Sequence, residues 1–411
     1  MINLTAVQRP GAVEPDQRRF RARVEAEAYV ASVCFKHGPP RLVGVELEWT
    51  VHHHDDPRRR LDRHHLADAL GPHAPPTLAA DSPHLPLPSG SSLTVEPGGQ
   101  VEISSLPSPS LGSLVDSVTT DTEHLTTLLA EAGLALGPGG LDPHRSPRRV
   151  LDTPRYTAME RAFARVGDAG ITMMCATAGL QVCLDSGERA DVATRFAAVT
   201  SLGPVFVALF GNSPAPGWHS ARTKAVQAVD PCRSKPLPIT DDPAADWARR
   251  VLDTPLLFVR RDSDDWSAPG GVTFADWIAG ALPEPPTHDD LDYHLTSMFP
   301  PVRPHGYLEV RYLDAQHGAD WAVPAALLTA LMADPATVDR VVELCAPAAD
   351  RWVRAARLGL ADPATRAAAH RVLDLGLPAV AGLDLPPPTA EAVTTALTRL
   401  ADRTALPGRQ Q

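Results

Sequence analysis

The sequence predicts an α+β protein built around an antiparallel sheet. Four short stretches alternate apolar and polar residues, as half-buried strands do. Helical patterns lie among them without a regular strand–helix–strand order, and neither GxGxxG nor GxxxxGK[ST] occurs. These observations favour antiparallel strands packed with helices over a parallel nucleotide-binding sheet.

The alternating stretches are 41–49 (RLVGVELEW), 100–104 (QVEIS), 180–185 (LQVCLD) and 307–314 (YLEVRYLD). Successive side chains of a strand point to opposite faces of its sheet. Glu46 and Glu48 are therefore expected on the face opposite Val43, Val45, Leu47 and Trp49. By the same count, the polar faces of the other strands carry Glu102, Gln181, Glu309 and Arg311.

The segments between these strands are expected to be helices and loops. A helix is predicted within 17–36, a second over 110–132 and a third over 156–165, while apolar 201–210 fits a buried helix. Residues 71–90 hold six prolines and are expected to form a mobile surface connection.

Alanine-rich amphipathic helices are predicted after Trp321, with apolar residues at helical spacing such as Val338, Val341, Val342 and Cys345. We expect residues 1–330 to form the domain that carries the chemistry. Residues 331–411 are expected to form a helical region packed on the same domain.

Composition excludes several classes of protein. The 411 residues carry 38 basic and 49 acidic side chains, a net charge of −11 with no basic cluster, which argues against nucleic-acid binding. The N-terminus shows no export signal, and the apolar run 204–210 falls far short of the roughly 20 residues that span a bilayer. Five cysteines without CxxC spacing suit a reducing compartment, so a cytoplasmic protein without a membrane segment is expected.

Glutamates recur on or beside the polar face of the predicted sheet: Glu46, Glu48, Glu96, Glu102 and Glu309. Each alone is as well explained by a solvated sheet face. Their repetition on separate strands favours a metal site, because buried carboxylates need cations nearby and hard oxygen ligands suit Mg²⁺ or Mn²⁺ rather than zinc.

Two arginines lie close to this pattern. Arg311 follows Glu309 by two residues, so both side chains share a face, and a cation beside metal-binding carboxylates suits phosphoryl transfer. A structural ion pair is the alternative. The rigid loop FPPVRPHG (299–306) can present Arg303 to the same site, or simply expose it. The histidine runs 52–54 and 64–65 lack ligand spacing and are interpreted as a solvated turn.

Six ordered blocks between about residues 30 and 330 resemble the glutamate–cysteine ligases of the plant and actinobacterial type. They are similar above all to the actinobacterial branch associated with ergothioneine biosynthesis. The blocks are VGVELEW, VEPGGQVEIS, MMCATAGLQVCLD, GNSP with SARTKAVQAVDPCR, TFADWI and HLTSMFPPVRPHGYLEVRYLD.

This resemblance implies a fold like the catalytic domain of glutamine synthetase, in which a curved antiparallel sheet forms a funnel. It also implies an enzyme that uses ATP and Mg²⁺, with Mn²⁺ as an alternative, to phosphorylate the γ-carboxylate of glutamate. The amine of cysteine then attacks the acyl phosphate, which yields γ-glutamylcysteine, ADP and phosphate.

The resemblance also implies a role for each matching residue. Gln181 would contact nucleotide or metal, Arg303 would contact the nucleotide cofactor, and Arg311 would hold the γ-phosphate as a catalytic residue together with Glu309. Glu96 would bind metal or glutamate, and Arg222 and Arg233 would bind a substrate carboxylate. The implied Mg²⁺ ligands are Glu46, Glu48, Glu102 and Glu309.

Two positions depart from the family pattern. Val226 stands where many relatives have tryptophan, which bears on the shape of the amino-acid pocket. Cys183 stands where many have asparagine, and we interpret it as a small apolar residue rather than a catalytic one. The sequence leaves three alternatives open: a ligase with another amine acceptor, a non-catalytic relative that binds nucleotide or amino acid, and a guanidino kinase.

Overall fold

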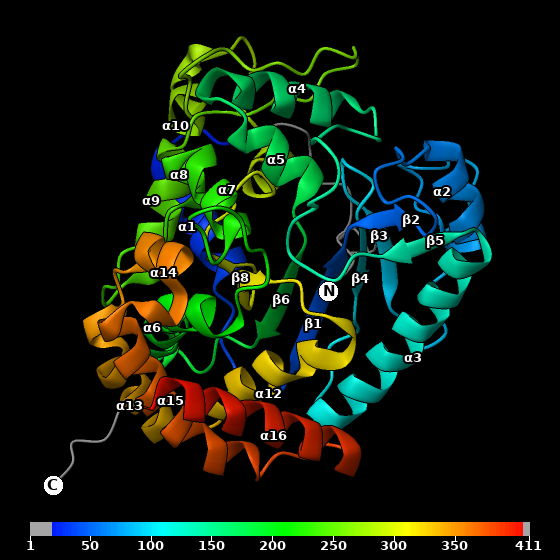
Figure 1. Ribbon diagram of the computed structural model, residues 1–411. Coiled ribbons are helices and arrows are strands. Elements are labelled where there is room, and N and C mark those ends of the chain that lie inside the picture. Colours follow the sequence, from blue (N-terminus) through cyan, green and yellow to red (C-terminus); the bar gives the residue numbers. More distant parts are fainter. Residues whose placement is uncertain (1–18, 406–411) are drawn as a thin grey trace, which may run out of the picture.

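The computed structural model describes residues 19–405 and centres on a six-stranded antiparallel sheet with the order β3-β4-β1-β6-β8-β7 (Figure 1). A separate two-stranded sheet pairs β2 with β5. The stretch predicted to lack an export signal lies largely outside the described residues. The strands are β1 (Val43–Trp49), β2 (Val51–His53), β3 (Ser92–Val95), β4 (Val101–Ser104), β5 (Leu134–Leu136), β6 (Gly179–Leu184), β7 (Val302–Pro304) and β8 (Leu308–Asp314).

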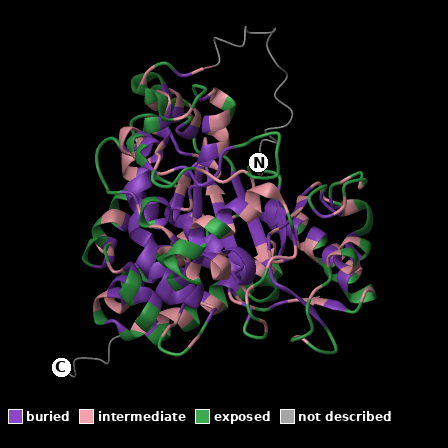
Figure 2. Cartoon of the chain, turned by 90° about the horizontal axis from the view of Figure 1, so that it is seen from above, coloured by how far each residue is buried: buried purple, intermediate pink, exposed green. Residues whose placement is uncertain are grey.

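Helices surround the sheet, and buried residues concentrate in the middle of the molecule (Figure 2). They are α1 (Arg23–Cys34), α2 (Arg63–Leu70), α3 (Leu111–Glu131), α4 (Pro154–Phe163), α5 (Ala169–Ala176), α6 (Val192–Phe210), α7 (Ala221–Val229), α8 (Pro231–Ser234), α9 (Pro243–Asp253), α10 (Phe274–Asp276), α11 (His288–Leu295), α12 (Ala322–Leu331), α13 (Pro335–Cys345), α14 (Trp352–Leu358), α15 (Pro363–Val380) and α16 (Pro387–Thr404).

The apolar face of the sheet packs against α6 and α14. Tyr312 of β8 donates its hydroxyl to the carbonyl of Val199 in α6 at 3.0 Å, and its ring meets Trp352 of α14 edge-on. α6 is long and apolar enough to pass a composition test for a membrane span, but 89% of the tested window is buried within the protein. Such burial is what a core helix of a globular protein shows.

The register of the strands brings the polar residues of separate strands side by side. Glu48 lies opposite Glu102 of β4, and Glu46 lies opposite Gln181 of β6. Glu309 of β8 lies between Cys183 on one side and Arg303 of β7 on the other. The pairing of β6 with β8 shifts between Leu180 and Val182, an irregularity of the kind that often occurs beside active sites.

The predicted helices over 110–132, 156–165 and 201–210 are confirmed as α3, α4 and the end of α6. Local capping explains where two of them begin. Ser110 accepts a hydrogen bond from the amide of Ser113 at the start of α3, and Thr153 caps α4 ahead of Pro154.

The C-terminal helices continue the core of the sheet domain. α13 and α15 pack on α6, and α16 packs on α15 and α12, so these helices gather at one side of the molecule (Figure 1). One hydrophobic cluster contains both Val45 of the sheet and Val393 of α16. The helical region therefore lies on the same body, and a domain boundary near residue 330 stays a prediction.

One expectation about polar segments is wrong. His52 and His53 were expected in a solvated turn, but both lie buried in β2, where His52 contacts Thr50 and His53 faces the carbonyl of Arg60. The error arose because the charged neighbours of these histidines do not report how the histidines pack. The proline-rich stretch 71–90 lies largely at the surface, with Leu78 and Leu87 buried in the core, and its mobility stays a prediction.

Candidate active site

Two cavities meet on the polar face of the sheet. The first, of about 330 Å³, is lined by every residue proposed from the sequence for the site except Arg233. The second, of about 450 Å³, lies between β1, β6 and α1. Glu46, His305 and Tyr307 line both cavities and so mark the place where they join. Volumes of this size are typical of small-molecule sites.

Carboxylates crowd the first cavity, and their pKa values reflect it. Burial, followed by repulsion from Glu309, raises the pKa of Glu46 to about 7. Burial and the nearby Glu48 raise the pKa of Glu96 to about 7. Burial, Glu46 and Glu48 raise the pKa of Glu102 well above its ordinary value. The folded protein thus holds several buried carboxyl groups that lack sufficient compensating positive charge.

Glu309 behaves differently because two arginines face it. Arg303 forms a two-pronged ion pair with its carboxylate, one prong at 2.9 Å, and Arg311 approaches to 3.4 Å. Burial alone would raise the pKa of Glu309, but these arginines together lower it to about 2. Glu309 is therefore ionised whenever the protein is folded near neutral pH.

Gln181 connects the arginine side of the site to the carboxylate side. Its amide nitrogen donates to Glu48 at 3.0 Å and reaches Glu102 at 3.4 Å, while its oxygen accepts a hydrogen bond from Arg311. This arrangement orients Arg311 over the sheet face. Gln181 thereby positions groups for both the proposed nucleotide contact and the proposed metal contact.

The residues present fit divalent metal ions. Glu46, Glu48, Glu96, Glu102 and Glu309 supply only oxygen atoms, the donor type that Mg²⁺ and Mn²⁺ prefer. Glu46 is 8% exposed and, among the residues that the structure describes, makes no side-chain hydrogen bond or ion pair. A divalent cation would offset the repulsion that raises these pKa values.

Mg²⁺ is therefore expected to raise the melting temperature more at about pH 8 than at about pH 6. Glu46 and Glu96 bind protons more tightly folded than unfolded, because their pKa rises from 4.5 to about 7. The metal-free protein accordingly loses stability as the pH rises through this window, and at the lower pH Mg²⁺ must displace protons. Thermal melts with and without Mg²⁺ measure this difference. An equal Mg²⁺ effect at both pH values would contradict it.

Two arginines that line the first cavity suit substrate carboxylates. Arg222 of α7 is buried, donates to the carbonyl of Arg311 at 3.0 Å, and its Nε has no hydrogen-bond partner. A Cβ atom at Gly179 would come within 2.3 Å of this guanidinium, so a larger residue there would have to displace Arg222. Arg155 of α4 bonds to Thr296 and lies over the rings of Phe258 and Tyr293.

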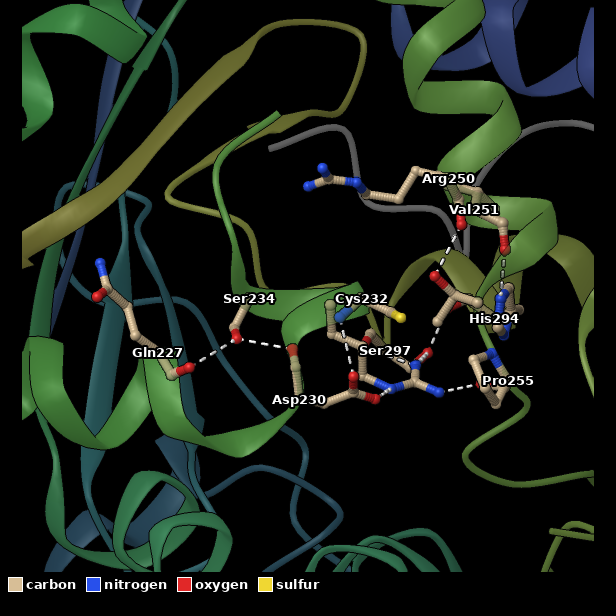
Figure 3. Close-up of polar contacts among 11 residues, drawn as sticks. Gln227, Asp230, Cys232, Ser234, Arg250, Val251, Pro255, His294 and Ser297 are labelled. Atoms are coloured by element: carbon tan, nitrogen blue, oxygen red, sulfur yellow. Dashed lines mark hydrogen bonds and ion pairs between the residues drawn. The ribbon is translucent and has the colours of Figure 1, made fainter. Parts of the chain in front are cut away.

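Arg233 does not reach this cavity. Its guanidinium donates to Asp230 at 3.0 Å, to both oxygens of Ser297 and to the carbonyl of Pro255 (Figure 3). Its neighbour Ser234 lines the cavity instead. The environment of Arg233 argues against the predicted role in binding a substrate carboxylate and favours a structural one.

The sequence-based reasoning missed several lining residues. Arg155 follows a helix cap and has no distinguishing spacing, and His305 and Tyr307 lie in the turn between β7 and β8. Cys183 was interpreted as an apolar residue, yet its thiol faces Glu46 and Glu309. Its position two residues after Gln181 on one strand was the available signal, because alternate residues share a face.

Comparison with known proteins identifies the family. A model of glutamate-cysteine ligase family 2 matches residues 42–396. The chain belongs to this family. It is 38% identical over 355 residues to glutamate–cysteine ligase EgtA of Mycolicibacterium smegmatis, which covers 84% of the chain and 81% of that relative. The chloroplastic glutamate–cysteine ligase of Medicago truncatula is 33% identical over 273 residues, 62% of the chain and 53% of the relative.

Solved structures confirm the fold. The crystal structure of glutamate–cysteine ligase from Francisella tularensis, in complex with AMP, matches with a TM-score of 0.52 at 12% identity. The match covers 90% of this family member and 83% of that chain. The predicted α+β, glutamine-synthetase-like fold with an antiparallel sheet is therefore confirmed, as is the family that the sequence blocks resemble.

Proposed function

We propose that this protein is an ATP-dependent glutamate–cysteine ligase that forms γ-glutamylcysteine through γ-glutamyl phosphate. The observation that carries the proposal is the joined pair of cavities, in which the carboxylates and Arg311 line the first cavity and Glu46 lines both. Membership in the family and its similarity to EgtA proteins support the same activity and a place in ergothioneine biosynthesis. ATP and reduced thiol substrates suit the cytoplasm.

The two cavities differ in the substrates that they suit. The first combines Arg155 and Arg222 with Glu96, so it offers cations to the α-carboxylates of the amino acids and an anion to an amino group. The second combines apolar side chains of β1 and α1 with Lys36, a lining that suits a nucleotide base and its phosphates. We assign glutamate and cysteine to the first cavity and ATP to the second.

The phosphoryl group would be transferred from ATP to glutamate at the place where the two cavities join. Mg²⁺ held by Glu46, Glu48, Glu102 and Glu309 would neutralise the phosphate oxygens. Arg311, fixed by Gln181 and Glu309, is placed to stabilise charge on the γ-phosphate during its transfer to the γ-carboxylate of glutamate. Arg303 holds Glu309 ionised and in place, and Arg222 holds glutamate so that its γ-carboxylate faces the junction.

A phosphate-release assay tests the activity. Purified protein with ATP and Mg²⁺ is expected to release phosphate only when glutamate and cysteine are both present, and γ-glutamylcysteine should accumulate in equal amount. Release with another amine but not with cysteine would assign a different acceptor, and phosphorylation of a guanidine would assign a kinase. No phosphate release with any amine would support a non-catalytic relative.

Arg222→Lys is expected to raise KM for glutamate with a smaller effect on kcat. Lysine keeps the charge but loses the paired donors that match a carboxylate, a difference of about 1.5–3 kcal/mol, or roughly 10- to 150-fold in KM. Steady-state kinetics at varied glutamate measure it, with exposed Arg58→Lys as the control. An unchanged KM for glutamate would remove Arg222 from the glutamate site.

A further inference from the structure

A thiol lies among the carboxylates at the edge of the proposed metal site. The Sγ atom of Cys183 and carboxylate oxygens of Glu46 and Glu309 all lie within 4.8 Å of one another. Among the residues that the structure describes, these three alone make such a grouping of metal-binding side chains. Cys183 is partly exposed and lines the second cavity, so a solute can reach it.

The buried carboxylate of Glu46, which lacks a partner among the described residues, is the second observation that points to a ligand at this place. It is more than nine-tenths buried and has no side-chain hydrogen bond or ion pair within residues 19–405. Glu309 keeps room for a cation even though Arg303 and Arg311 face it, because a carboxylate has about four lone-pair positions. Two oxygens and one sulfur can thus converge on one ion.

We propose that Glu46, Cys183 and Glu309 capture a thiophilic divalent cation, with Zn²⁺ as the representative, and that its binding inhibits the enzyme. Thiolate sulfur combined with carboxylate oxygen is a donor set that Zn²⁺ accepts in a four-coordinate site. Mg²⁺ avoids sulfur and prefers oxygen ligands. The fourth position is left for water or a nucleotide phosphate.

Metal binding explains the surroundings of the Cys183 thiol better than a role in oxidation does. Cys183 faces the carboxylates of Glu46 and Glu309, whose charge repels a thiolate, whereas reactive cysteines lie in electropositive surroundings. A cation between the thiol and the two carboxylates reverses that repulsion. When the metal–sulfur bond forms, the thiol proton passes to solvent, and no oxidant or reductant takes part.

Inhibition follows because Zn²⁺ and the catalytic Mg²⁺ compete for the same carboxylates. Glu46 and Glu309 are proposed ligands of the catalytic Mg²⁺, and a zinc ion bound with Cys183 would hold both beside the second cavity. This consequence rests on the proposed ligase function. The binding of the thiophilic ion itself does not, so the two can be tested separately.

Cobalt(II) titration of the full-length protein without substrates tests the site. Co²⁺ replaces Zn²⁺ in such sites and gives a thiolate-to-metal absorption band in the near ultraviolet. We expect one equivalent of Co²⁺ to produce this band, Zn²⁺ to abolish it, and Cys183→Ser to lack it. Cys232→Ser, which removes an exposed thiol, is the matched control and should keep the band. Melting curves show that each variant is folded.

The inhibition is measured separately in the phosphate-release assay at buffered free Zn²⁺, because the cysteine substrate also binds zinc. Cys183→Ser is expected to raise the inhibitory Zn²⁺ concentration by roughly tenfold or more, the least that loss of even an outer partner of a metal site costs. A band that persists in Cys183→Ser, or the lack of any band in the wild-type protein, would overturn the site. Equal inhibition of both proteins would overturn its regulatory role. An inactive protein that still shows the band would fail only the ligase proposal.

Discussion

Glu46→Gln is expected to lower kcat by at least about 100-fold, because it removes one charged ligand from ions that contribute several kcal/mol to phosphoryl transfer. The same change should leave the metal-free fold as stable as before, or more stable. Burial and Glu309 raise the pKa of Glu46 to about 7, which means that its ionised form opposes folding near neutral pH. Phosphate release and thermal melts without metal measure the two effects.

The matched control is Glu343→Gln, which changes an exposed glutamate of α13 in the same way. It should alter neither activity nor the melting temperature by much. Retained turnover in Glu46→Gln would contradict its role as a metal ligand. A large loss of metal-free stability would contradict the conclusion that Glu46 lacks a protein partner.

Glu309→Gln is also expected to abolish turnover, but here the fold should weaken by about 3–5 kcal/mol, the usual cost of removing one partner from a buried ion pair. Glu309 is 1% exposed, and its loss leaves the guanidinium of Arg303 without its carboxylate. Urea unfolding without metal measures the change in stability, and phosphate release measures turnover.

The double variant Arg303→Met with Glu309→Gln separates the two roles of Glu309. It should recover part of the lost stability, because the buried guanidinium of Arg303 is no longer left without its carboxylate, while turnover stays absent. A Glu309→Gln protein that is as stable as the wild type would contradict the structural role of the ion pair. Recovery of turnover in the double variant would contradict the metal role.

Alternation along single strands was enough to predict the polar face of the sheet. A strand turns successive side chains to opposite sides, so Glu46 and Glu48 share one side of β1, and Glu309 and Arg311 share one side of β8, before the strand order is known. The order of the strands then determines which of them become neighbours. Gln181 lies opposite Glu46 only because β6 pairs with β1, which strand alternation alone does not specify.

Roles that depend on contacts with distant segments could not be predicted from the local sequence. Arg222 and Arg233 both lie in the block SARTKAVQAVDPCR, yet one faces the cavity and the other is enclosed by Asp230, Ser297 and Pro255. Ser297 and Pro255 come from distant segments, so nothing in the local sequence distinguishes the two arginines. His52 and His53 became buried for a similar reason, since β5 supplies the partner strand.

The proposed ligase activity requires the sheet face that lines the first cavity to activate the γ-carboxylate of glutamate as an acyl phosphate. Glutamate carrying heavy oxygen in its γ-carboxylate, incubated with ATP, Mg²⁺ and cysteine, tests this directly by mass spectrometry of the released phosphate. If the γ-carboxylate attacks the γ-phosphate, one heavy oxygen per turnover must appear in the phosphate. Unlabelled phosphate, released together with γ-glutamylcysteine, would contradict an acyl-phosphate intermediate.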